Sequence, residues 1–155
     1  MDKQRYDDRT TRNIMIKRIV EFDRKSDIYL IAFWPTPEAD GDSRQAFEWA
    51  YRALLCTYNC NFQIIQHPSQ ALPLKSMPYI SLEQKNPGTQ SLRDFEHPKK
   101  AVYLVGNAKY SSPGAVLGCD YKVHIEVPNM EHPLYGDQAA AIAFNDRYMK
   151  NGTSI

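Results

Sequence analysis

The sequence predicts an α/β fold in which a mostly parallel sheet carries helices on both faces. Short apolar runs rich in β-branched and aromatic residues recur along the chain, and segments with helical or turn character separate them. The runs are apolar throughout, as expected of strands that are buried on both faces. Because strands alternate with helical connections, parallel pairing is favoured over hairpins.

The composition is that of one soluble globular domain with a cytoplasmic location. Of the 155 residues, 43% are hydrophobic and 24% are charged, and no stretch approaches the roughly 20 apolar residues of a membrane span. The N-terminus opens on polar residues without the apolar core of a signal peptide. Because no stretch could span a membrane, we predict no membrane partner. Cys56, Cys60 and Cys119 form no paired C-x-x-C arrangement, so we predict no metal site.

Residues 1–27 are predicted to form a basic N-terminal extension that is part helical, and residues 28–155 to form the main domain. Residues 1–25 hold eight Lys or Arg against five Asp or Glu, although the whole chain has a net charge of only +1. Apolar residues recur at helical spacing from about Thr10 to Lys25. Two interpretations of the basic excess stay open, a solvated face or an arm that contacts RNA.

The first half of the domain contains three predicted strands and one helix. The run 28–34 is an uninterrupted strand that Pro35 ends. A helix follows from Asp42 or Ser43 to about Thr57, with a small and apolar face directed at the sheet. Further strands are predicted at 62–66 and 77–82.

The second half begins with a polar loop at 83–100 that has room for one helical turn. Strands are predicted at 101–105 and 122–127, with a turn at 111–114 and a short helix up to Cys119 between them. A last helix is predicted at 136–150. Ligands of open parallel sheets bind at the carboxyl ends of strands, so we expect a site where the strands before Glu83, Gly106 and Pro128 end.

Several common catalytic and nucleotide-binding motifs are missing from the sequence. There is no Gly-rich dinucleotide fingerprint and no P-loop, since Gly106 stands alone at its strand end. Ser111 and Ser112 lack a nucleophile-elbow context, which argues against triad chemistry. Glu131 and His132 are adjacent in a loop, where neighbouring side chains point apart, and we interpret them as loop residues.

Three successive runs between His97 and Tyr148 carry a family resemblance. They read HPKKAVYLVGN, then AVLGCDYKVHIEVP, then PLYGDQAAAIAFNDRY, and in order and spacing they resemble the SpoU/TrmH branch of the SPOUT RNA methyltransferases. The resemblance extends over nearly the whole chain after residue 27. It implies S-adenosyl-L-methionine (SAM) as cofactor, a deep trefoil knot at the C-terminal helix, and a homodimer in which each active site is completed across the interface.

The resemblance also implies a set of site residues. The positions that match the cofactor site are Leu82, Val105, Gly106, Val127, Pro128 and Leu134. These residue types suit an adenine ring, which needs an apolar slot and a few backbone groups for its polar edge. Gly106 has no Cβ to obstruct a ligand. Arg52 matches the family's motif-one arginine, which would approach the acceptor, and a surface ion pair is the alternative for it.

The chain departs from the family pattern at three polar positions. Gly106-Asn107-Ala108 stands where the family has Gly-x-Glu, and Pro133-Leu134-Tyr135 stands where it has Ser-x-Asn before the last helix. Ala46 stands where motif one has Asn. Asn107, Tyr135 and Asp137 are the available polar substitutes.

The function implied is SAM-dependent RNA methylation, with a ribose 2'-hydroxyl of tRNA or rRNA as the acceptor. The polar losses leave open an alternative, a catalytically degenerate SPOUT domain that binds SAM, its demethylated product SAH, or RNA without turnover. A third reading also stays open, a small α/β protein without a cofactor in which the Gly and Pro turns merely end strands.

Overall fold

A computed structural model describes residues 26–33, 41–71, 74, 76–106 and 113–152, and for 41–47 it describes the backbone alone. The predicted helix within residues 10–25 therefore lies outside the described residues, and the boundary at residue 27 stays a prediction. Among the described helices, none is long and apolar enough to cross a membrane.

The predicted parallel sheet is confirmed. Within the described residues six strands form one sheet in the order β2-β1-β5-β3-β6-β4, and every neighbouring pair is parallel. The strands are β1 Ile28–Phe33, β2 Asn61–Ile65, β3 Tyr79–Glu83, β4 Gln90–Ser91, β5 Ala101–Val105 and β6 Tyr121–His124. All five residues of β5 are buried, because this strand lies inside the sheet between β1 and β3.

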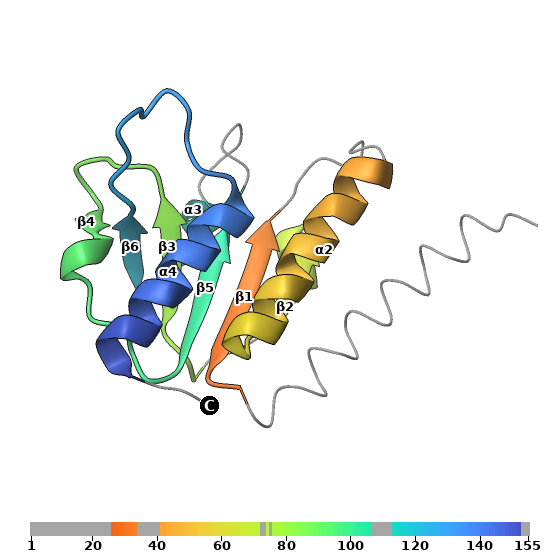
Figure 1. Cartoon of the computed structure of the whole chain (residues 1–155), viewed down its shortest axis with the longest axis horizontal. Helices are drawn as coiled ribbons and strands as arrows, with labels where there is room; N and C mark the ends of the chain where they lie inside the picture. Colours follow the sequence, from red (N-terminus) through yellow and green to blue (C-terminus); the bar gives the residue numbers. More distant parts are fainter. Residues whose placement is uncertain (1–25, 34–40, 72–73, 75, 107–112, 153–155) are drawn as a thin grey trace, which may run out of the picture.

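One face of the sheet is covered by two helices, α2 (Gly41–Tyr58) and α4 (Gly136–Asn151), which lie side by side (Figure 1). The core on this face joins Tyr51 of α2 and Phe144 of α4 to Tyr103 of β5. The rings of Tyr103 and Phe144 meet edge to face with centroids 5.1 Å apart. Ala140 and Ala143 are fully buried, and their small side chains let α4 approach the sheet closely.

The opposite face has its own apolar cluster, so the prediction of covered faces is confirmed. Tyr29, Ile31, Val102 and Leu104 lie on this face, and Leu117 of the short helix α3 (Pro113–Leu117) packs against them. The helix approaches the sheet most closely at Gly114, where a Cβ would lie 2.8 Å from Oγ of Ser81. Leu74 and Met77 cover the remainder of this cluster.

Two predicted boundaries are wrong. The strand predicted at 122–127 ends at His124, because its neighbour β3 ends at Glu83, the residue in register with His124. The loop predicted at 83–100 contains the two-residue strand β4, which pairs with β6, and the single turn η2 (Leu92–Asp94). The turn η2 is the single helical turn that we predicted within this loop.

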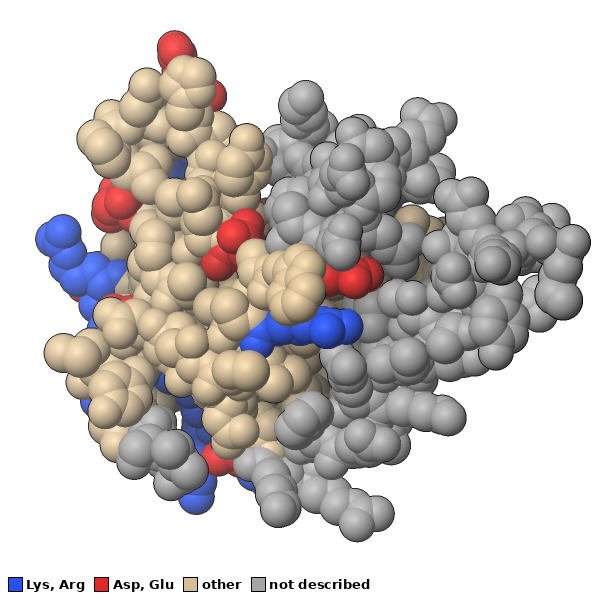
Figure 2. Space-filling model, turned by 45° about the vertical axis from the view of Figure 1, so that its right-hand side comes forward, with Lys and Arg blue, Asp and Glu red and all other residues tan. Residues whose placement is uncertain are grey.

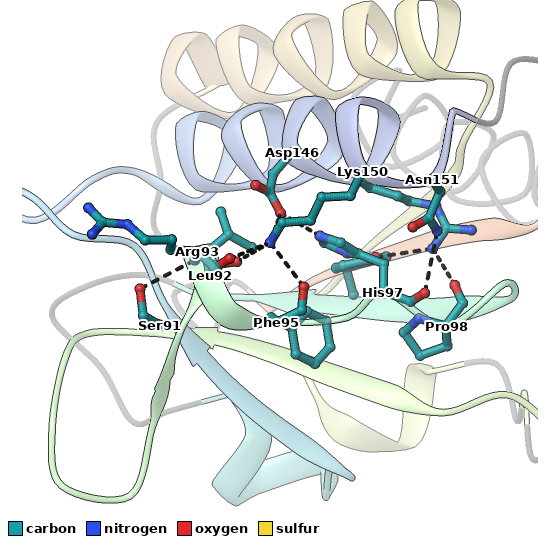
Figure 3. A network of polar contacts seen from close by, with 11 residues as sticks. Ser91, Leu92, Arg93, Phe95, His97, Pro98, Asp146, Lys150 and Asn151 are labelled. Atoms are coloured by element: carbon teal, nitrogen blue, oxygen red, sulfur yellow. Dashed lines mark hydrogen bonds and ion pairs between the residues drawn. The ribbon is translucent and has the colours of Figure 1, made fainter.

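A polar network fastens the last turns of α4 to the segment between β4 and β5 (Figure 3). We call it the α4 clasp, and its side chains are His97, Asp146, Arg147, Lys150 and Asn151. The Lys150 ammonium donates to the carbonyl oxygens of residues 92, 93 and 95 at 2.6, 2.9 and 3.0 Å. Arg147, which is 2% exposed, donates to the carbonyls of residues 98 and 99. The clasp therefore holds the last turns of α4 against the segment that leads into the start of β5.

Candidate functional site

A cavity of about 400 Å³ opens where β5, β3 and β6 end and α4 begins. Each wall comes from a different element. Leu82 and Glu83 end β3, Val105 ends β5 and is followed by Gly106, and the first turn of α4 closes one side. The cavity therefore lies at the edge of the parallel sheet where the sequence led us to expect a ligand.

Five of the six residues predicted to contact a cofactor line this cavity, namely Leu82, Val105, Gly106, Val127 and Leu134. The sixth, Pro128, is exposed and is not among the lining residues. The difference follows from the shorter β6: the chain has left the sheet by His124, so Val127 reaches the cavity from a loop and its neighbour Pro128 faces solvent. Contact of these residues with a cofactor stays a prediction.

Two glycines set how closely the walls meet. A Cβ on Gly106 would lie 3.1 Å from Cδ of Pro113, so the missing side chain admits the start of α3 to the strand end. A Cβ on Gly136 would lie 2.9 Å from Oη of Tyr51 and 3.2 Å from the carbonyl oxygen of Gly106. Gly136 thus brings α2, the end of β5 and the start of α4 together at one corner of the cavity.

A hydrogen-bonded chain of four side chains begins at the cavity wall, to which Lys85 and Glu126 belong. Nζ of Lys85 lies 3.3 Å from Oε2 of Glu126, and Oε1 of Glu126 lies 2.8 Å from Nε2 of His124. Nδ1 of His124 in turn lies 2.8 Å from Oγ1 of Thr89. The hydrogen bonds from His124 and Lys85 lower the pKa of the Glu126 carboxyl. The chain ties the loop after β6 to the loop after β3.

Glu83 contributes a second carboxylate to the wall. Its Oε2 atom is buried and has no hydrogen-bond partner among the residues that the structure describes. Glu83 was not predicted as a site residue, because it stands at the start of a polar loop in the sequence. A signal was available, since an acidic residue directly follows the apolar strand that ends at Leu82.

The predicted acceptor-side residue, Arg52, lies on α2 and is not among the cavity-lining residues. It is half-buried, and its guanidinium carbon lies 5.7 Å from the ring centroid of Trp49. Trp49 itself is 62% exposed. This cation–π contact is compatible with the surface ion pair that we considered for Arg52, and that alternative stays open.

The three polar substitutes have different positions. Tyr135, which is 65% exposed, precedes α4, and its backbone N–H donates to Oε1 of Gln138 at 2.9 Å. Asp137 lies in the first turn of α4. Burial raises the pKa of Tyr51, and the charge of Asp137 raises it further. Asn107 lies outside the described residues, and neither Tyr135 nor Asp137 is among the cavity-lining residues.

One face of the molecule carries charges of both signs. On the side of the molecule that carries α2, Figure 2 shows Lys and Arg interspersed with Asp and Glu over the described residues. Together with the net charge of +1, this arrangement gives a weak long-range field. Within the described parts of the chain, no group of three His, Cys, Asp or Glu residues could hold a metal ion.

Fold and cavity together define an α/β protein with a parallel sheet and a ligand-sized hollow at the strand ends. No protein-family model matches the chain, and no curated protein matches its sequence. The chain is similar to a solved structure described as "Structural insights into the 2-OH methylation of C/U34 on tRNA". The two share 14% identity over 81% of this chain and 97% of the other, with a TM-score of 0.50. This likeness establishes a shared fold.

Proposed function

We propose that this protein is a cytoplasmic, SAM-dependent RNA methyltransferase of the SPOUT class that methylates a ribose 2'-hydroxyl of tRNA or rRNA. The observation that carries the proposal is the cavity, which gathers five residues of the resemblance, Leu82, Val105, Gly106, Val127 and Leu134, at one strand edge. The words printed for the solved structure, methylation of a 2-hydroxyl on tRNA, lend it further support.

The residues of the cavity suit an adenosyl ligand. A volume of about 400 Å³ falls within the range of small-molecule sites. The apolar side chains of Leu82, Val105, Val127 and Leu134 offer slots for a purine ring, and the bare backbone at Gly106 offers polar groups for its edge. The Glu83 carboxylate and the Lys85 ammonium offer partners for hydroxyl, ammonium and carboxylate groups.

Methyl transfer from SAM requires little of the protein other than the alignment of the acceptor with the methyl group. Bound SAM supplies an activated methyl group, and holding an acceptor hydroxyl in line with it accounts for much of the rate. We propose that Arg52 holds an acceptor phosphate by its fork of donors. Because Arg52 is not among the lining residues of its own chain's cavity, the proposal includes a homodimer in which α2 of one chain serves the other. It also includes the deep trefoil knot at α4.

Calorimetry and transfer of a labelled methyl group test the proposal in two steps. We expect SAM to bind the full chain, and labelled methyl to reach the 2'-oxygen of bulk tRNA or rRNA. Binding without transfer would favour the catalytically degenerate domain, and absence of binding at millimolar SAM would favour an α/β protein without a cofactor.

Arg52 is tested against a matched arginine. Arg52→Ala should abolish labelling and leave SAM affinity intact, whereas Arg93→Ala, at an exposed position of the turn η2, should change neither. Unchanged labelling in Arg52→Ala would refute the acceptor-side role.

A further inference from the structure

Glu83 is a half-buried residue of the cavity wall, and one oxygen of its carboxylate is fully buried. Glu83 is the last residue of β3, opposite His124 of β6. Leu82, the residue before it, packs in the core under α2 and α4, so the alternation of a strand directs Glu83 to the face that carries α3. There its Oε2 atom is buried, with no hydrogen-bond partner among the described residues.

An unpaired buried carboxylate oxygen is costly, because it has given up its hydrogen bonds to water. The other charges of the cavity do not compensate for it. Lys85 and Glu126 pair with each other at 3.3 Å, and their side chains are 53% and 47% exposed, so solvent screens both. Among the charged residues of the wall that the structure describes, Glu83 is therefore the carboxylate without an ion pair.

We propose that the Glu83 carboxylate makes this cavity selective for the cationic, sulfonium form of an adenosyl ligand over its neutral thioether. The inference rests on the proposed function and deepens it. SAM and SAH differ by one methyl group and by the positive charge on sulfur. A fixed negative charge in a partly desolvated wall attracts the first ligand more than the second, because Coulomb interactions strengthen as water is excluded.

The consequence concerns release of the product. In methyl transfer the acceptor oxygen bonds to the methyl carbon, the sulfur keeps the electron pair of the broken bond, and the hydroxyl proton leaves to solvent. The ligand thereby loses its positive charge. The Glu83 carboxylate would then attract SAH less strongly than SAM, which favours the release of SAH and the binding of a new SAM molecule.

Calorimetry on the full chain tests this inference with three ligands: SAM, SAH, and sinefungin, which carries an ammonium in place of the sulfonium. Glu83→Gln keeps the shape of the side chain and removes the charge. We expect it to weaken SAM and sinefungin about tenfold and to leave SAH within about twofold. The matched control is Glu131→Gln, at an exposed loop position that is not among the cavity-lining residues. It should shift all three ligands by less than about threefold.

The outcomes separate this inference from the proposed function. If the wild type binds none of the three ligands, both are wrong. If it binds all three and Glu83→Gln weakens SAM and SAH by the same factor, or weakens neither, the charge selectivity alone is wrong. Thermal unfolding checks that Glu83→Gln folds. Should it not fold, the wild type still decides, because equal affinities for sinefungin and SAH contradict the selectivity.

Discussion

Nε2 of His97 lies 2.7 Å from Oδ2 of Asp146, and this contact joins the segment before β5 to α4 (Figure 3). On its other side, Nδ1 of His97 lies 2.6 Å from Oη of Tyr103. Burial raises the pKa of Tyr103 to about 12, so the phenol keeps its proton and donates it to Nδ1. A neutral imidazole with its proton on Nε2, donated to Asp146, satisfies both contacts.

The stability of the fold should therefore fall in mild acid. Burial lowers the pKa of His97 below its usual 6.5, against the hydrogen bond and charge of Asp146, and the charges of Arg147 and Lys150 lower it further. In the unfolded chain the same histidine takes up a proton near pH 6.5. The free energy by which neutral His97 stabilises the folded state is thus fully present above about pH 6.5. It is lost as the pH falls through the lowered pKa of His97 in the folded state. Melting temperatures measured between about pH 7.5 and about pH 5 should show this decline.

The control for this prediction is a second histidine. His97→Asn should melt at a lower temperature than the wild type at neutral pH, with a flatter dependence on pH, because the group that titrates is gone. His132→Asn, at an exposed loop position, should keep the wild-type slope. If all three proteins lose stability in parallel as the pH falls, other groups are responsible.

The parallel sheet could be predicted because strands that are buried on both faces are apolar throughout, and such runs are recognisable in the sequence. The run 101–105 is apolar throughout since its neighbours β1 and β3 and both covering layers exclude water. The strand β4 is not such a run. Its two residues, Gln90 and Ser91, are polar, and they pair with β6 at the edge of the sheet. No periodicity can be recognised over two residues.

The apolar wall of the cavity was predictable for the same reason, and its polar groups were not. Val105 and Leu82 mark strand ends that any parallel sheet brings together. Glu83 lines the cavity because β3 continues one residue past Leu82 and ends at Glu83, and the sequence does not show that end point. The α4 clasp could not be predicted either, because Arg147 and Lys150 donate to backbone carbonyls, and such contacts have no sequence motif.

Replacement of Gly136 by Ala should destabilise the protein by about 1–3 kcal/mol. Near the end of a helix the change from Gly to Ala is usually neutral or favourable, because Ala loses less backbone entropy. Here the new Cβ would lie 2.9 Å from Oη of Tyr51, which is 3% exposed and cannot swing aside, and 3.2 Å from the carbonyl oxygen of Gly106. Denaturant unfolding measures the loss.

A second substitution shows whether that clash is the cause. Tyr51→Phe removes the hydroxyl that the new methyl group would meet. Combined with Gly136→Ala, it should recover at least about 0.5 kcal/mol relative to the sum of the two single changes. Additive effects would locate the damage elsewhere.

Arg147→Met should cost about 3 kcal/mol of unfolding free energy. The arginine is 2% exposed and donates to the carbonyls of Pro98 and Lys99, so its loss leaves these acceptors unpaired next to an apolar side chain of similar length. Urea unfolding with an unchanged m-value measures the loss. Arg93→Met, with an exposed side chain on η2, should change the free energy by less than about 0.5 kcal/mol. Equal costs in the two variants would mean that Arg147 acts through its charge alone.

The three cysteines should react with an alkylating reagent in a fixed order. Cys56 is exposed on α2 and should react first. Cys119 is half-buried, and burial raises the pKa of its thiol, so it should react more slowly. Cys60 is 1% exposed, and burial raises its pKa to about 12, so it should react only when the chain unfolds.

Timed alkylation followed by peptide mass measurement gives the three rates, and Cys56→Ser should remove the fast phase alone. Labelling of Cys60 at the rate of Cys56 in native protein would show that the start of β2 opens freely, contrary to its place in the core.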